Sequence, residues 1–438
     1  MNLNARMKEI DARLSEIRKM TNDESDVYKC GTILSLVLIV TISIIYFTYS
    51  KFSSRNEATA YETTVEPFIK NDYFIASYID GEWSNEIPGK NDGYIVDKIV
   101  CDNGATGTWD NEEWGINIRN ATKKIKCGVY FKKLVKLTEQ ITTLASTDTT
   151  NFASDDPDSN IRYIGTNANS YVYFNCSDYS NQSDSTCEKW HIIGVFKNIT
   201  KADGTKEDLV KLRRNEALPY DYISFDNYGS SNYSNNWETS SIKQMLNDSY
   251  YNSLTAKNIY DRDDIVEETI IDFSSSGLKN NQTRNSIESV VWNLGGVPNT
   301  NLLPSDFYSY ERGSLTYGNN PVIWTGKIAL PYISDYLYSV GDNSTSTRSQ
   351  CLNIKHDEWF YPSYCAYNAM VFWKSWYLDI SSISGIHVPR IGGSSLVFYE
   401  VGSGMTEPGA IPVLYLKSDI TILKGDGSET NPYQLNLQ

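Results

Sequence analysis

Motifs that mark common enzyme classes are missing from this sequence. It has no G-x-S-x-G, no H-E-x-x-H and no glycine-rich loop of the kind that holds phosphate. Histidine is scarce: His191, His356 and His387 are scattered, and no C-x-x-C occurs, which argues against a zinc site. These absences predict a chain without a catalytic residue, a cofactor or a bound metal.

An excess of positive charge is also lacking. The formal net charge is −15, and residues 1–30 hold six basic and six acidic side chains. Residues 31–50 hold no charged side chain, so the whole acidic excess follows residue 50. An acidic region is repelled by phosphate backbones and by anionic lipid headgroups. We therefore expect no nucleic acid partner.

The uncharged stretch at 31–50 (GTILSLVLIVTISIIYFTYS) predicts a transmembrane helix. Twenty helical residues span roughly 30 Å, the thickness of the hydrocarbon core of a bilayer. A cleaved signal peptide is the alternative, because Ala58-Thr59-Ala60 resembles a cleavage site. That site lies several residues past a run that is already long, and the region before the run is longer than usual. An uncleaved anchor in the lipid bilayer is favoured.

The basic residues that flank the span predict its orientation. Four lie within the 20 residues before it and three within the 20 residues after it. The positive-inside rule then predicts a cytoplasmic N-terminus and extracellular C-terminal domains in a single-pass protein of the cell membrane.

Cysteine usage supports the same orientation. Cys30 stands alone at the membrane boundary, and the other six form three local pairs, Cys101 with Cys127, Cys176 with Cys187, and Cys351 with Cys365. An even number of locally paired cysteines predicts disulfides in an oxidising compartment. Each would contribute roughly 3 kcal/mol through loop-closure entropy.

Residues 1–30 predict a cytoplasmic amphipathic helix. Its apolar residues follow the alternating spacing of four and three that is typical of heptads: Leu3, Met7, Ile10, Leu14 and Ile17. The stripe predicts either self-association into a homo-oligomer or a helix that lies on the lipid surface.

The remainder predicts an α+β chain that is mostly β, because aromatic residues suit strands and small polar residues suit turns. We expect a polar stalk, a small β-sandwich-like module, a Thr- and Ser-rich linker and a larger mixed α+β domain, at 51–65, 66–137, 138–158 and 159–438. Two acidic groups resemble calcium ligands, but a turn and the linker explain them better: Asp110, Glu112 and Glu113, and Asp156, Asp158 and Asn160.

Within the larger domain, residues 161–175 and 188–199 predict strands of one meander, which residues 209–214 continue. Residues 239–254 predict a helix that starts with a Ser241-x-x-Gln244 capping box. Its buried face would hold Ile242, Met245, Leu246, Tyr250 and Leu254. The C-terminal residues predict two strands around a glycine-rich turn.

Several segments resemble an uncharacterised family of membrane-anchored surface proteins of gut Firmicutes and their wall-less relatives. The resemblance rests on CDNGATGTWDNEEWGINI, WETSSIKQMLND, WTGKIALPYISDYLYS and, most specifically, PVLYLKSDITILKGDGSETNPYQL, and covers most of 66–438. The helix and the C-terminal strand are also faintly similar to the C-type-lectin-like group, which implies that fold for the larger domain. The family has no assigned activity that the resemblance could transfer. The arginine that often precedes the strand's proline is absent at Ala410-Ile411-Pro412.

A dense group of aromatic residues surrounds Cys365 and supplies the candidate ligand-binding residues Trp359, Tyr361, Trp373 and Trp376. Exposed aromatic rings stack on sugars or anchor protein partners, although the same residues could instead form the core.

The sequence predicts a non-catalytic cell-surface binding or adhesion protein for a glycan or protein ligand. One alternative is an extracellular enzyme that acts on glycans or cell wall, which would need two carboxylates, or a histidine and a carboxylate, at catalytic distance. The other alternative is a structural or signalling membrane protein that self-associates through its N-terminal heptads.

Overall fold

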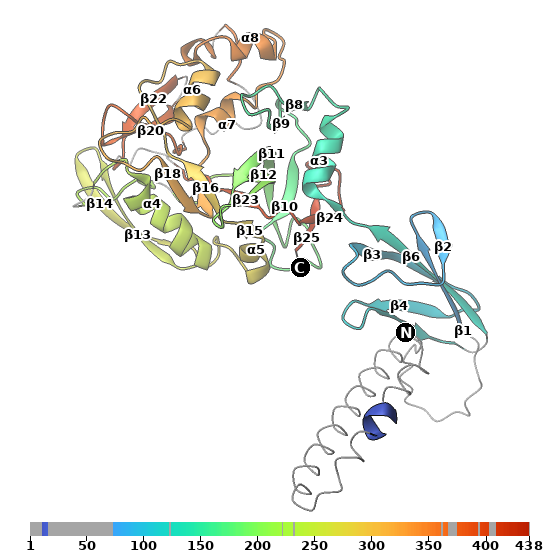
Figure 1. Cartoon of the computed structure of the whole chain (residues 1–438). Helices are drawn as coiled ribbons and strands as arrows, with labels where there is room; N and C mark the ends of the chain where they lie inside the picture. Colours follow the sequence, from blue (N-terminus) through green and yellow to red (C-terminus); the bar gives the residue numbers. More distant parts are fainter. Residues whose placement is uncertain are drawn as a thin grey trace, which may run out of the picture. The chain divides into compact units, whose positions relative to one another are not determined.

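Contacts within the chain divide it into two compact units, Met1–Lys133 and Leu134–Gln438. We call residues 73–133 the β module and residues 134–438 the main domain (Figure 1). The structure is a computed structural model, and it describes residues 11–15, 73–121, 124–220, 222–230, 233–360, 362–366, 375–392, 395–402 and 409–437.

Most of the predicted N-terminal features lie outside the described residues. Residues 11–15 are helical and the side chain of Leu14 is exposed. The other heptad residues (Leu3, Met7, Ile10 and Ile17), the predicted span 31–50 and the predicted stalk 51–65 are not among the described residues. Within the part of the chain that is described, no helix combines the length and apolarity that a membrane crossing requires.

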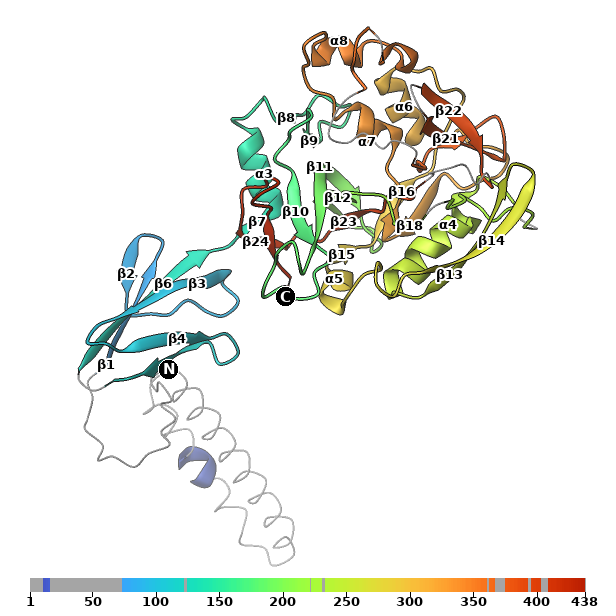
Figure 2. The ribbon, with the colours of Figure 1, turned by 180° about the vertical axis from the view of Figure 1, so that it is seen from behind.

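The β module consists of a four-stranded sheet in the order β2-β1-β6-β3 and a separate hairpin, β4–β5. β1 runs parallel to β6, whereas the other pairs are antiparallel. The hairpin covers one face of the sheet, where the ring of Trp109 meets that of Phe131 edge-on at 5.3 Å (Figures 1 and 2). The strands are β1 (Tyr73–Ile79), β2 (Glu82–Ser84), β3 (Tyr94–Cys101), β4 (Thr106–Asp110), β5 (Gly115–Arg119) and β6 (Ile125–Lys133).

The prediction of a linker at 138–158 is wrong. The main domain begins at Leu134, and β7 (Val135–Lys136) pairs with β24 (Thr421–Lys424) near the C-terminus. Helix α3 (Leu137–Ala145) buries Leu137 and Ile141, and β8 (Phe152–Ala153) joins the main sheet. The composition is polar because most of this segment faces solvent, yet a few apolar side chains are enough to attach it to the core.

The main domain is built on an antiparallel sheet in the order β15-β23-β12-β11-β9-β8. In addition, β10 pairs with β11, and β19 pairs with β23. Its central strands are covered on both faces, since residues 209–213 are buried without alternation. Gly194 allows β11 to pair closely with β9, because a Cβ atom at position 194 would lie 2.0 Å from the Ile161 carbonyl oxygen. The strands are β9 (Ile161–Tyr163), β10 (Tyr171–Phe174), β11 (Glu188–Thr200), β12 (Lys206–Arg214), β15 (Ile287–Glu288), β19 (Ile328–Ala329) and β23 (Val413–Leu416).

Short helices and strand pairs surround this sheet. Helices α6, α7 and α8 gather at one end, and the hairpin β13–β14 lies beside α4 (Figures 1 and 2). The helices are η1 (Trp237–Thr239), α4 (Ser241–Gln244), η2 (Met245–Tyr250), α5 (Asn281–Ser286), α6 (Pro304–Glu311), α7 (Ile333–Leu337), α8 (Arg348–Leu352) and η3 (His356–Glu358). The remaining strands are β13 (Thr255–Arg262), β14 (Ile265–Asp272), β16 (Val290–Asn293), β17 (Gly296–Val297), β18 (Ile323–Gly326), β20 (Ile380–Ser381), β21 (His387–Gly392), β22 (Ser395–Glu400) and β25 (Gln434–Asn436).

The predicted meander and the C-terminal strands are confirmed, and the predicted outer helix is confirmed in part. The N-cap is Ser240, whose hydroxyl accepts from the Lys243 amide, so the predicted capping box at Ser241 is wrong. The helix continues as the π-helix η2, and Tyr250 is its last buried residue. Leu254 follows the helix and is exposed, contrary to the prediction.

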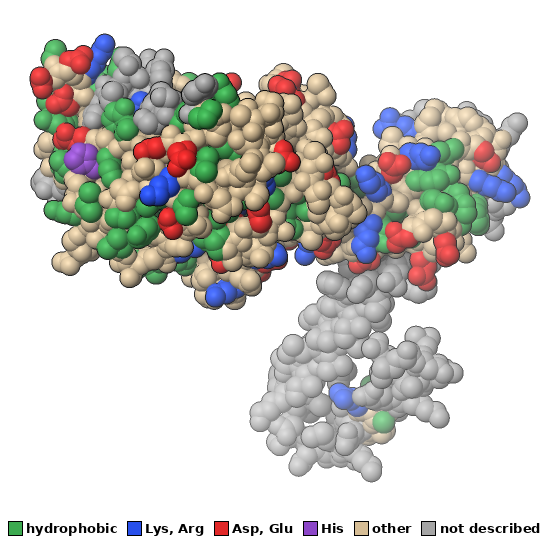
Figure 3. All heavy atoms as spheres, turned by 90° about the horizontal axis from the view of Figure 1, so that it is seen from above, with side chains coloured by type: hydrophobic (Ala, Val, Ile, Leu, Met, Phe, Trp, Pro, Cys, Tyr) green, Lys and Arg blue, Asp and Glu red, His purple; other side chains and the backbone are tan. Residues whose placement is uncertain are grey.

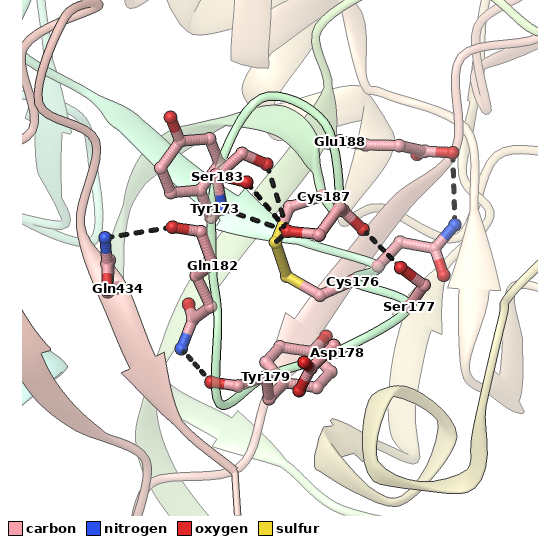
Figure 4. Close-up of a disulfide and its surroundings, with 12 residues drawn as sticks. Tyr173, Cys176, Ser177, Asp178, Tyr179, Gln182, Ser183, Cys187, Glu188 and Gln434 are labelled. Atoms are coloured by element: carbon pink, nitrogen blue, oxygen red, sulfur yellow. Dashed lines mark hydrogen bonds between the residues drawn. A yellow bond between two sulfur atoms is a disulfide. The ribbon is translucent and has the colours of Figure 1, made fainter.

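All three predicted disulfides are present. The bond between Cys176 and Cys187 closes the loop that connects β10 to β11 (Figure 4). Gln182 in this loop donates to the Leu435 carbonyl at 2.7 Å and accepts from the Leu435 amide at 2.9 Å. The loop is therefore attached to the last strand of the chain as well as to its own base.

Candidate functional site

The face of the β-module sheet that lies opposite the β4–β5 hairpin carries an exposed cluster of aromatic side chains. We call Phe74, Tyr78, Trp83 and Tyr130 the aromatic face. Phe74 is 53% exposed and Trp83 is 56% exposed. The ring of Trp83 lies 5.1 Å from that of Tyr78 and 5.4 Å from that of Tyr130, both edge-on. Edge-to-face contacts of this kind are favourable for aromatic pairs and hold the rings in defined orientations.

Strand alternation explains why these residues share one face. On β6, Val129 and Phe131 point into the module core, so Tyr130 points outward. On β1, Tyr78 pairs with both Trp83 and Tyr130 in the ladder, and paired residues point to the same side.

A two-residue turn sets the position of Trp83. Asp80 and Gly81 connect β1 to β2, and both have positive φ values, 51° and 93°. Asp-Gly between extended runs is the preferred sequence of a type I′ hairpin, because both residues tolerate the left-handed region. None of these four aromatic residues is among the binding residues predicted from the sequence, although the Asp-Gly pair was the signal that could have revealed them.

Two hollows lie on either side of the Trp83 ring. The smaller has a volume of about 330 Å³ and is bordered by Phe74 and Lys126. The larger has a volume of about 590 Å³ and is bordered by Tyr130 and Lys132. Trp83 contributes to both hollows, so its ring forms a low wall between them.

Lysine side chains surround the aromatic face. Lys98 places its ammonium 4.5 Å from the centre of the Tyr130 ring. Lys126 and Lys132 alternate with Tyr130 on β6 and are exposed. Figure 3 shows hydrophobic side chains on the β module with charged side chains, many of them Lys or Arg, around them. The hydroxyl of Tyr94 donates to Asp80, and this hydrogen bond raises the pKa of Tyr94.

The predicted ligand-binding aromatic residues do not form an exposed surface where the structure describes them. Trp359 and Trp376 are completely buried in the main core, and the Trp376 indole donates to the Ile223 carbonyl at 2.6 Å. Both are therefore unavailable for stacking on a ligand, and their assignment as binding residues is wrong. Tyr361 and Trp373 lie outside the described residues.

A further cavity of about 270 Å³ opens in the main domain. Its walls come from β11, β16, α6 and β23 and include Trp292, Tyr308 and Tyr415. Asp158 is the single carboxylate among its lining residues, and no histidine borders it. This cavity therefore lacks the acid pair, or the histidine and carboxylate, that glycan hydrolysis would require.

Beneath that cavity lies a buried network of charged groups. Asp335 accepts from Lys211 at 2.6 Å and from Arg162 at 3.1 Å, and all three side chains are buried. Burial lowers the pKa of Lys211 to about 8, although Asp335 partly opposes this shift. Because its members bond to one another and are shielded from solvent, the network is structural.

A buried contact between a serine just before β10 and a histidine on β11 also has a structural explanation. The Nδ1 atom of His191 lies 2.9 Å from the Ser170 hydroxyl, and its Nε2 atom lies 2.7 Å from the Asn215 side-chain oxygen. Ser170 and His191 are both buried. Burial lowers the pKa of His191 to about 3, so the imidazole is a neutral hydrogen-bonding group.

The acidic groups that resembled calcium ligands bond to their own surroundings. Asp110 accepts from the amides of Glu112 and Glu113, and these bonds lower its pKa. Asp156 pairs with Arg162 at 2.8 Å. In the described part of the chain, no three acidic, histidine or cysteine side chains cluster as metal ligands would.

Comparisons with protein-family models, with curated proteins and with solved structures each gave no match.

Proposed function

We propose that this chain is a membrane-anchored cell-surface protein that binds glycans through the aromatic face of its β module. The observation that carries the proposal is the exposure of Trp83, a large ring set between two hollows on a sheet. Large apolar side chains that are exposed together on a rigid element usually mark an interaction site.

Chemistry favours a sugar as the ligand. A pyranose ring presents C–H bonds that pack on the face of an aromatic ring, while its hydroxyls remain free for hydrogen bonds. The hollows beside Trp83 are bordered by polar groups that can accept or donate such bonds, including Ser84, Asn85 and Lys126.

The predicted anchor supplies the cellular context of the proposal. The uncharged run at 31–50 and the three disulfides after it both favour delivery of the β module and main domain to an oxidising exterior. Thiol labelling of the denatured, unreduced full chain tests this part. We expect one reactive thiol, Cys30, and seven after reduction. The topology would be refuted if seven reactive thiols were found before reduction. It would also be refuted if protease added to intact cells left the C-terminal part uncut.

A glycan array with the full chain in detergent tests the binding function. Trp83→Ala should weaken glycan binding by about 30-fold, as expected for a residue that contributes about 2 kcal/mol. Tyr317→Ala, which removes another exposed aromatic side chain in the main domain, is the matched control and should bind as the wild type does. Glycan binding that Trp83→Ala leaves unchanged would refute the proposal.

A further inference from the structure

Charge around the aromatic face differs in sign from the charge of the chain as a whole. The lining of the smaller hollow contains one charged side chain, Lys126. The lining of the larger hollow contains Lys98, Lys132 and Lys133 together with Asp80 and Asp97. The two hollows thus have an excess of positive side chains in a protein with a net charge of −15.

The Asp80 carboxylate in the larger hollow accepts from the Tyr94 hydroxyl. The exposed ammonium groups of Lys126 and Lys132 form no ion pair with a carboxylate in the described part of the chain. They remain available to a ligand from solution.

The spacing of these lysines follows from the strand. Lys126, Gly128, Tyr130 and Lys132 occupy alternate positions of β6, so they point to the same side. At the rise of an extended strand, Lys126 and Lys132 lie about 20 Å apart along it. Trp83 lies between them, because its ring contacts Gly128 and Tyr130.

We infer that the aromatic face takes an anionic polysaccharide, with a sugar ring on Trp83 and acidic groups of neighbouring sugars beside Lys98, Lys126 and Lys132. This inference rests on the proposed glycan-binding function and names the ligand class. A lipid surface is the less suitable anionic ligand, because membrane-binding aromatic side chains protrude from an edge or a loop into the headgroups. Trp83 instead lies down on the sheet, against Gly128.

Two pairs of polymers, each a charged chain and its uncharged counterpart, test the ligand class. They are polygalacturonate with its methyl ester, and dextran sulfate with dextran. We expect the full chain to bind at least one charged polymer ten times or more tightly than its neutral partner, because several exposed ion pairs each add a modest increment. Raising the salt concentration should reduce this preference, since exposed charges are screened.

The variant Lys98→Gln/Lys126→Gln/Lys132→Gln should lose the preference for the charged polymer. The matched control is Lys206→Gln/Lys257→Gln/Lys424→Gln, which removes the same charge from exposed positions of the main domain and should keep the preference. Thermal unfolding of both variants checks that they are folded.

The outcomes separate this inference from the proposed function. If binding requires Trp83 but is equally tight for charged and neutral polymers, the inference that the ligand is anionic is overturned. The proposed glycan-binding function would still stand. Absence of binding to every polymer and every arrayed glycan would overturn both. Binding to vesicles of anionic lipid, with none to the polymers, would overturn the inference in favour of a membrane surface.

Discussion

The ring of Trp83 on β2 packs on Gly128 of β6, a residue that has no side chain. A Cβ atom at position 128 would lie 2.7 Å from the Cη2 atom of Trp83, closer than two carbon atoms can approach. The glycine therefore allows the indole to lie against the strand. The exposed ring of Trp83 therefore has a defined position on the sheet.

Replacing Gly128 should separate binding from stability. In Gly128→Ala the added methyl group should push the Trp83 ring away from the sheet. Because the ring is already exposed, stability should change by less than about 0.5 kcal/mol. Glycan affinity should fall at least severalfold, and titration of the full chain with a bound glycan measures it. Unchanged affinity would mean that the ring position is not important for binding.

Buried tryptophans of the main domain should behave in the opposite way. Trp376→Ala removes a side chain with no exposed surface and leaves the Ile223 carbonyl without its donor. We expect a loss of about 3–5 kcal/mol in the free energy of unfolding, because a cavity remains. Denaturant titration of the main domain's transition measures the loss. A cost below about 1 kcal/mol would contradict the assignment of Trp376 to the core.

The central ion network predicts a contrast between buried and exposed acids. Asp335→Asn leaves Lys211 and Arg162 buried without their shared carboxylate, and the expected cost is about 3–5 kcal/mol. Glu268→Gln removes the acid of an exposed pair with Lys257 and should cost less than about 0.5 kcal/mol. Chemical denaturation of both variants provides the comparison, and equal costs would count against a structural role for the network.

A buried carboxyl group predicts an unusual pH dependence. Burial, and then the neighbouring Glu311, raise the pKa of Asp379 well above its ordinary value. The folded protein therefore keeps a proton on Asp379 that the unfolded chain loses near pH 4. This difference lowers stability as the pH rises from about 4 towards the folded-state pKa.

The variant Asp379→Asn imitates the protonated acid and should remove this contribution. The difference in unfolding free energy between variant and wild type should then grow in favour of the variant as the pH rises above 4. Denaturation at a series of pH values measures the difference and cancels contributions from other groups. A difference that stays constant with pH would show that Asp379 titrates normally.

Local features of the fold could be predicted from the sequence. Short separations between cysteines identified all three disulfides, because nearby cysteines have few other partners. The short runs rich in apolar residues at 188–199 and 209–214 identified two central strands, β11 and β12. Both signals are local, so they do not depend on the overall topology.

Features that depend on distant contacts could not be predicted in the same way. Lys211 lies in an ordinary strand pattern, and its burial depends on distant groups such as Asp335, 124 residues away, and the ring of Tyr332. The group of aromatics near Cys365 was more prominent than Trp83, yet density along the sequence does not indicate exposure. Trp359 and Trp376 pack inside because residues such as Ile223 and Tyr336 come from other parts of the chain.

The parallel pairing of β1 with β6 has a mechanical consequence. The chain enters the β module at Tyr73, at one end of this pair, and leaves it at Lys133, at the other. A pull between those two points acts along the strands, so it shears all six residue pairs of the ladder together instead of separating them one at a time. A β module joined in this way is suited to carry tension between whatever precedes Tyr73 and whatever follows Lys133.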